Sequence, residues 1–75
     1  KRSKDFRRVA ATLARRLRLA REGRGWTVDR AAQEYGVEPM SVWRLETGEA
    51  NPTLATLVSI ASALKVLLSE LLDEK

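Results

Sequence analysis

The sequence contains neither cysteine nor histidine. Without cysteine the chain forms no disulfide and offers no thiolate ligand, and without histidine it lacks the commonest zinc ligand and the commonest general base. It has no apolar run approaching the ~18 residues that span a bilayer, and no apolar stretch of a signal peptide follows its basic start. We therefore expect a cytoplasmic protein that binds neither a metal ion nor a membrane and folds by apolar packing alone.

Catalytic motifs are missing too. The chain has no nucleophile near a base, no glycine-rich phosphate loop and no metal-ligand spacing. Its 75 residues are enough for one domain with a modest core. We predict that the protein is not an enzyme and uses no cofactor.

Charge is divided unevenly along the chain. Residues 1–30 hold eleven Lys and Arg against three Asp and Glu, whereas residues 31–75 hold three against seven. Such a distribution is expected of a protein that lays one basic face on nucleic-acid phosphates. It is equally typical of a well-solvated helix face, so charge alone does not decide between the two.

Apolar residues recur at helical spacing in five segments, and no segment has the two-residue alternation of a strand. The first predicted helix runs from residue 6 to Gly23 or Gly25, and the next three cover residues 28–35, 38–47 and 54–64. A fifth short helix carries Leu68, Leu71 and Leu72, and the core includes Tyr35, Val58 and Leu64. We predict an all-α, compact five-helix bundle over residues 6–75, preceded by a basic N-terminal arm over residues 1–5.

The second and third predicted helices are separated by only a few residues. Helices so close in sequence cross steeply if their contact is small and the turn permits left-handed backbone geometry, and Ala32 and Gly36 meet these two conditions. With Val42 and Leu45 inward, the third helix presents five residues outward: Glu38, Pro39, Met40, Trp43 and Arg44. This pattern is typical of a helix-turn-helix, whose second helix reads base edges in the major groove.

Spaced matches to a known pattern run from residue 13 to residue 72. They are Leu17-Arg18, Arg21-Glu22, Gly25-Trp26-Thr27, Ala32, Gly36-Val37, Arg44-Leu45-Glu46, Gly48, Asn51-Pro52-Thr53-Leu54, Leu57, Ile60-Ala61, Ala63-Leu64 and Ser69-Glu70-Leu71-Leu72. In these positions the chain resembles the Cro and lambda-repressor type of helix-turn-helix family, also called the XRE family. The resemblance implies a lambda-repressor-like bundle, commonly a dimer on a pseudo-palindromic operator, with a structural salt bridge between Arg21 and Glu46.

The sequence departs from the family pattern at several positions. Val28 stands where the family usually has a phosphate-binding glutamine, although backbone amides at that helix start can still meet a phosphate. Lys65 stands for the glycine expected before the last helix, and Leu67 for the serine expected to cap it. The third helix opens with Glu38-Pro39-Met40 instead of small polar residues, so we expect an unusual base-reading surface.

Two kinds of DNA contact are predicted. Base contacts are assigned to the five outward residues of the third helix, with Arg44 as the guanine reader; the alternative is a surface cation paired with Glu46 or Glu49. Glu38 can accept from a cytosine amino group, but a carboxylate at a helix start more often serves as a cap. Phosphate contacts are assigned to Arg15, Arg16, Thr27, Val28, Ser41, Thr47, Asn51 and Thr53.

We therefore predict sequence-specific binding of double-stranded DNA by a nucleoid-associated, repressor-like transcriptional regulator. A homodimer is expected because one short helix reads few bases, with Val66, Leu67 and Leu71 at the self-contact. The alternative is a protein-interaction module, such as the antitoxin of a toxin–antitoxin pair, for which exposed Leu19, Met40 and Trp43 would be suited.

Overall fold

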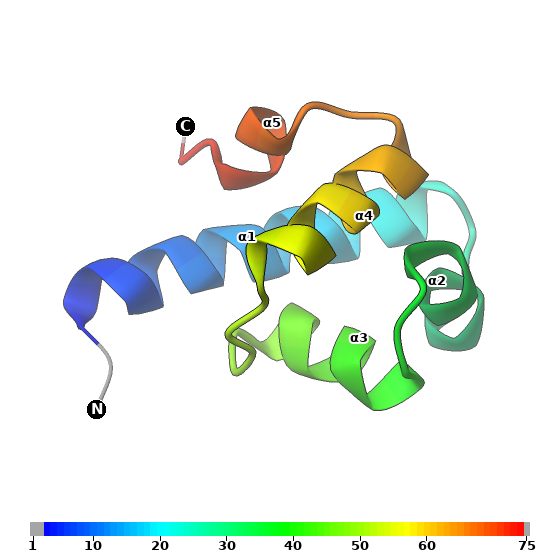
Figure 1. Cartoon of the computed structure of the whole chain (residues 1–75), viewed down its shortest axis with the longest axis horizontal. Helices are drawn as coiled ribbons and strands as arrows, with labels where there is room; N and C mark the ends of the chain where they lie inside the picture. Colours follow the sequence, from blue (N-terminus) through cyan, green and yellow to red (C-terminus); the bar gives the residue numbers. More distant parts are fainter. Residues whose placement is uncertain (1–2, 75) are drawn as a thin grey trace.

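Five helices make up residues 3–74, the part of the chain that this computed structural model describes. They are α1 (Lys4–Gly23), α2 (Val28–Tyr35), α3 (Pro39–Thr47), α4 (Leu54–Leu64) and α5 (Leu68–Leu72). The long α1 runs through the molecule, and α3 and α5 pack against it on opposite sides in Figure 1. The all-α, five-helix prediction is confirmed over these residues.

The N-terminal boundary differs from the predicted one. Ser3 caps α1 by accepting a hydrogen bond from the Phe6 amide at 3.1 Å, and the helix begins at Lys4. Lys4 and Asp5 are therefore helical instead of belonging to an arm over residues 1–5. Residues 1 and 2 of that predicted arm lie outside the described residues.

One apolar core joins all five helices. Its most deeply buried large side chains are Leu17, Tyr35, Val42, Ile60 and Leu64. The core assignments of Tyr35 and Leu64 are confirmed, but that of Val58 is wrong, since Val58 is 53% exposed. Almost every residue of α4 is apolar or small, so the sequence leaves its inward face ambiguous; the core takes Ile60, Ala61 and Leu64, with Leu57 packed against it.

The surface predicted for self-contact is only partly exposed. Leu71 is 4% exposed and belongs to the core, and Val66 is half-buried and packs against it. Because Leu71 belongs to the core, its part of the prediction is wrong, whereas that of Val66, which is partly exposed, stays a prediction. Leu67 is 69% exposed, as the prediction required.

The junction between α4 and α5 carries backbone strain. Lys65 has φ 58° and ψ 42°, the left-handed conformation in which a side chain costs free energy, and it closes α4 by donating its amide to carbonyls of the last turn. Leu67 precedes α5 without a polar side chain, and the Glu70 carboxylate instead accepts from the Leu67 amide at 2.8 Å. Lys65, in place of the expected glycine, therefore adopts a strained backbone conformation. In place of the expected serine cap, the Glu70 carboxylate caps the start of α5.

Replacing Lys65 by glycine should raise the free energy of unfolding by about 1 kcal/mol, because glycine adopts the left-handed conformation without a Cβ penalty. Thermal unfolding measures the change. Lys65→Ala is the matched control, since it removes the charge but keeps the Cβ, and it should give no comparable gain. Equal stability of the two variants would contradict the attribution to backbone strain.

Candidate nucleic-acid interface

The turn between α2 and α3 has the geometry that the sequence predicts. Gly36 ends α2 with φ 74°, and the amides of Gly36 and Val37 both donate to the Ala32 carbonyl, at 2.9 and 3.0 Å. Ala32 is 3% exposed, so α2 and α3 approach closely at a small side chain. The two helices therefore form a helix-turn-helix with α3 at the surface.

The outer face of α3 is open to solvent. Met40 is 58% exposed and Trp43 is 60% exposed, and Glu38, Pro39 and Arg44 are exposed as well. Glu38 is the N-cap residue, as expected of a cap, yet its side chain makes no capping hydrogen bond. The structure thus brings all five predicted base-contacting residues to one exposed end and face of α3.

The Arg44 guanidinium forms no ion pair with another residue of the 3–74 range. Glu46, one of its two proposed partners, is engaged by Arg21. The alternative of a paired surface cation therefore finds no support, and the five N–H donors of Arg44 can turn to a ligand.

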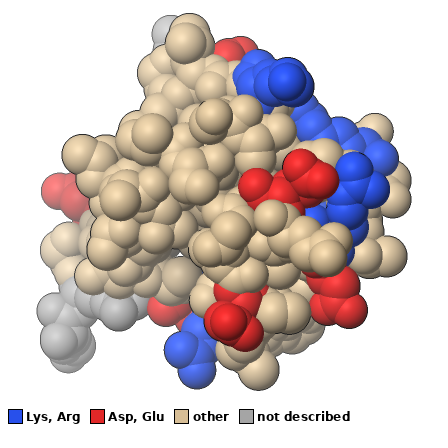
Figure 2. All heavy atoms as spheres, turned by 45° about the vertical axis from the view of Figure 1, so that its right-hand side comes forward, with Lys and Arg blue, Asp and Glu red and all other residues tan. Residues whose placement is uncertain are grey.

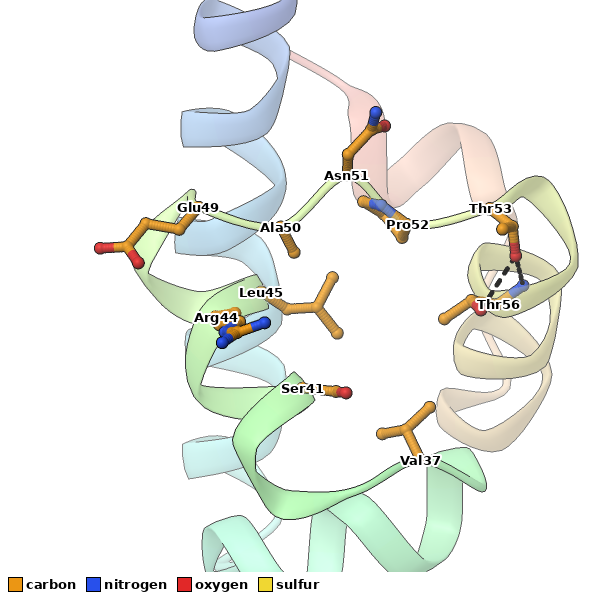
Figure 3. Close-up of a pocket in the computed structure, with 10 residues that line it drawn as sticks. All are labelled: Val37, Ser41, Arg44, Leu45, Glu49, Ala50, Asn51, Pro52, Thr53 and Thr56. Atoms are coloured by element: carbon orange, nitrogen blue, oxygen red, sulfur yellow. Dashed lines mark hydrogen bonds between the residues drawn. The ribbon is translucent and has the colours of Figure 1, made fainter.

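A groove between α3 and the start of α4 lies next to Arg44 (Figure 3). Ser41 of α3 and Asn51 of the connecting loop line it together with Thr53. Thr53 caps α4, since its Oγ1 accepts from the Thr56 amide at 3.1 Å. Three predicted phosphate-contacting residues thus converge beside a helix N-terminus. Thr56 also lines this groove and escaped the sequence analysis, although its place in the first turn of α4 was a usable signal.

A second groove lies between α2 and the start of α3. Thr27 and Pro39 line it, together with Gln33, which sequence reasoning missed. Thr27 caps α2 by accepting from the Arg30 amide at 3.0 Å. The Val28 side chain packs against the core, so this residue can offer a phosphate only its backbone amide. The N-termini of α2 and α4 therefore flank α3 on its two sides.

Of the two arginines predicted to meet phosphates from α1, only one lies near α3. Arg15 lines a shallow groove together with Thr47 at the end of α3. Arg16 instead donates from Nε and Nη2 to the Asp73 carbonyl, at 3.1 and 2.8 Å. Since Asp73 follows α5, the structure does not bring Arg16 to the exposed face of α3.

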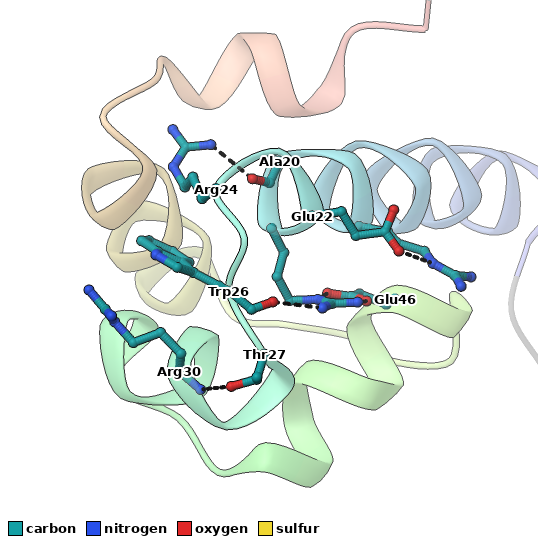
Figure 4. A network of polar contacts seen from close by, with 9 residues as sticks. Ala20, Glu22, Arg24, Trp26, Thr27, Arg30 and Glu46 are labelled. Atoms are coloured by element: carbon teal, nitrogen blue, oxygen red, sulfur yellow. Dashed lines mark hydrogen bonds and ion pairs between the residues drawn. The ribbon is translucent and has the colours of Figure 1, made fainter.

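The predicted salt bridge between α1 and α3 is formed, and it is bidentate (Figure 4). Arg21 donates from Nε and Nη2 to the two Glu46 carboxylate oxygens at 2.7 and 3.0 Å, and from Nη1 to the Trp26 carbonyl at 2.9 Å. The side chains are 14% and 8% exposed, and donating hydrogen bonds to the Glu46 carboxylate raises the Arg21 pKa above its ordinary value. One guanidinium thus fixes α3 against α1 and the loop before α2.

Several basic residues in the first half of the chain form ion pairs with acidic side chains in the fold. Arg8 pairs with Asp5 and Glu74, Arg18 with Glu22, and Arg30 with Glu34. In Figure 2, most Lys and Arg lie along the right-hand edge, a further basic group lies at the bottom, Asp and Glu are scattered among and beyond them, and a broad uncharged surface lies to the left. The asymmetry of charge along the sequence is therefore reduced on the folded surface. Arg15 and Arg44 form no ion pair within residues 3–74.

Comparisons with known proteins agree with this geometry. A family model described as a helix-turn-helix domain matches residues 12–74. The HTH-type transcriptional regulator SutR of Escherichia coli (strain K12) is 38% identical over 58 residues, which are 77% of this chain and 33% of SutR. None of the helices in residues 3–74 is long and apolar enough to cross a membrane.

Two solved structures are similar in both sequence and fold. An HTH_3 family transcriptional regulator from Vibrio cholerae is 35% identical with a TM-score of 0.81, over 88% of this chain and 37% of that one. The restriction-modification controller protein C.AhdI from Aeromonas hydrophila is 27% identical with a TM-score of 0.78, over 83% and 94%. The chain thus spans about a third of the SutR and Vibrio regulators.

Proposed function

Because the chain belongs to the helix-turn-helix family of the Cro and lambda-repressor type, we propose that it binds double-stranded DNA sequence-specifically and regulates transcription, with α3 in the major groove. The observation that carries the proposal is the exposed outer face of α3, flanked by the N-termini of two other helices. Duplex DNA has the matching form, a groove wide enough for one helix between two rows of phosphates.

Phosphates on either side of the groove are met by the flanking helix starts. Backbone amides at the start of α2 and α4 carry the positive end of the helix dipole, which favours a phosphate. Thr27, Ser41, Asn51 and Thr53 add hydroxyl and amide donors beside these starts. Arg15 and Thr47 extend the contact along the end of α3. These contacts set the position of the protein on DNA and carry no sequence information.

Sequence is read by the side chains on α3. Arg44 can donate two parallel hydrogen bonds to guanine O6 and N7, a pairing that discriminates against other bases by roughly 1 to 3 kcal/mol. Glu38, exposed at the N-cap, accepts from a cytosine amino group or repels phosphates from poorly fitting sites. Met40 and Trp43 present apolar surface beside Arg44.

A homodimer on two half-sites completes the proposal. The exposed large apolar side chains away from α3 include Leu54, Val58 and Leu67, and residues 51–64 contain no charged residue. In a two-fold dimer the same surface of each copy faces its equivalent on the other. A charged residue near the symmetry axis would therefore face the same charge on the partner and be repelled. An uncharged stripe on α4 is therefore suited to self-contact. Because this stripe lies next to Thr53, the dimer contact would fix the distance between the two α3 helices, and with it the spacing of the half-sites.

Selection of bound duplexes from a random pool, at two salt concentrations, tests the proposal. We expect two inverted half-sites about one helical turn apart, bound by two chains, with affinity that falls steeply with salt. Salt-insensitive binding to one protein instead of DNA would favour the protein-interaction alternative. A single half-site occupied by one chain would reject the dimer.

Replacing Arg44 by alanine should weaken binding to the selected duplex by about tenfold to a hundredfold and relax the preference at one position per half-site. Arg8→Ala is the matched control, since Arg8 is an exposed arginine on α1 paired with Asp5 and Glu74, away from α3. Affinities measured for duplexes with each base at that position separate loss of preference from loss of affinity. An Arg44→Ala variant that keeps the wild-type preference would exclude Arg44 as the guanine reader.

A further inference from the structure

The exposed outer face of α3 carries two large apolar side chains, Met40 and Trp43. Of the six large hydrophobic residues that are exposed among residues 3–74, Met40 and Trp43 both lie on this nine-residue helix. The other tryptophan, Trp26, behaves differently: it packs against the core and meets the Tyr35 ring edge-on at a centroid distance of 6.4 Å. Trp43 therefore lacks the structural role that Trp26 has.

The major groove contains one apolar group that such side chains can recognise. Base edges there present hydrogen-bond donors and acceptors, together with the C5-methyl group of thymine. An apolar side chain set against a donor or acceptor removes its water without replacing the hydrogen bond, which is unfavourable. Against a methyl group the same side chain buries apolar surface on both partners, which is favourable. Cytosine methylated at C5 presents the same methyl at the same place.

The positions of the three side chains set the register of this contact. Met40 precedes Trp43 by three residues and Arg44 by four, so all three lie on one side of α3 within about one turn, a rise of roughly 6 Å. Base pairs are stacked roughly 3.4 Å apart along the duplex. Arg44 and the apolar pair thus meet the same or adjacent base pairs.

We propose that Met40 and Trp43 read a C5-methyl group next to the guanine bound by Arg44. Thymine and 5-methylcytosine are then accepted at that position, whereas cytosine and uracil are disfavoured. The inference rests on the proposed function, because it requires α3 to lie in the major groove. It adds a form of regulation, since methylation of one cytosine beside the guanine would raise the affinity of a site.

Duplexes that differ by one methyl group test this inference. In the selected site, each thymine is replaced in turn by uracil, and in a parallel pair a cytosine at the reading position is compared with 5-methylcytosine. Removing the methyl group at the reading position should weaken wild-type binding by about threefold to fivefold per half-site, the effect of exposing one methyl group. Uracil at the other thymines should have a smaller effect.

Matched variants assign the effect to side chains. In Trp43→Ala and Met40→Ala the affinity ratio between methylated and unmethylated duplexes should shrink toward one. Leu19→Ala removes an equally exposed apolar side chain from α1 and should keep the full ratio. Because Trp43 is 60% exposed, its variant should keep the wild-type melting temperature.

Three results would overturn the inference. A wild-type protein whose affinity is unchanged by every uracil replacement reads no methyl group, although its DNA binding stands. A ratio that is the same in wild type, Trp43→Ala and Met40→Ala places the methyl contact elsewhere. Absence of specific binding to any duplex overturns the proposed function and this inference together.

Discussion

Replacing Arg21 by alanine should lower the free energy of unfolding by about 3 kcal/mol, because it leaves the Glu46 carboxylate buried without its cation. Glu46 is 8% exposed at its side chain and loses two hydrogen bonds, and the Trp26 carbonyl loses a third. In a domain of this size such a change lowers the melting temperature by more than about 10 °C. Thermal or urea unfolding measures it directly.

Two further variants show whether the loss of stability comes from leaving the Glu46 carboxylate buried without a partner or simply from removing an arginine side chain. Arg18→Ala breaks an exposed pair with Glu22, in which the side chains are 64% and 52% exposed, and should cost no more than about 0.5 kcal/mol. Adding Glu46→Gln to Arg21→Ala removes the unpaired charge and should restore part of the lost stability. Equal melting temperatures for Arg21→Ala and Arg18→Ala would show that the bidentate pair does not stabilise the fold.

The free energy of unfolding of the wild-type protein should fall by about 2 to 3 kcal/mol between pH 10 and pH 12 because of Tyr35. The Tyr35→Phe variant should not show this fall. Burial, aided by the nearby Glu46 carboxylate, raises the pKa of Tyr35 to about 12. The unfolded phenol ionises near pH 10, so the stabilisation is fully present below pH 10. It is lost as the pH rises through the folded pKa, because the unfolded state releases its proton first.

The chain has one tyrosine, so the ultraviolet absorbance of its phenolate follows this titration directly. At neutral pH the Tyr35→Phe variant should be as stable as wild type or more stable, because the buried hydroxyl has no hydrogen-bond partner among the described residues. A folded-state titration near pH 10, or a large destabilisation of Tyr35→Phe at neutral pH, would contradict this account.

The sequence predicts a helix boundary well where a single residue, such as a capping threonine or a turn glycine, sets that boundary. Thr27 and Thr53 cap helices through their own hydroxyls, and Gly36 supplies the left-handed turn, so each boundary depends on one residue type. The partnership of Arg21 with Glu46 came from resemblance to a family, because two residues 25 positions apart have no local pattern that would join them.

Burial was harder to predict where the sequence has no polar contrast. α4 is apolar or small along its whole length, so the sequence alone does not tell which side of α4 Val58 faces; the packing of α2 and α5 on α4 decides it. The same holds for Leu71, which α5 buries on a core built from distant helices. Arg16 looked like its neighbour Arg15 in sequence, but one turns to Asp73 and the other toward α3.

Helices α1 and α5 pack against each other although they are the first and last helices of the domain. Arg16 meets the Asp73 carbonyl and Arg8 meets Glu74, so this contact closes a longer stretch of sequence than the α1–α3 contact made by Arg21 and Glu46. Closing the longest loop costs the most chain entropy, and in the five residues of α5 only Leu71 is fully buried, with Leu68 and Leu72 partly buried. We therefore expect helix α5 to dock last during folding. In the native protein it should detach first, so its backbone amides should exchange with solvent by a local opening while α2 and α3 remain folded.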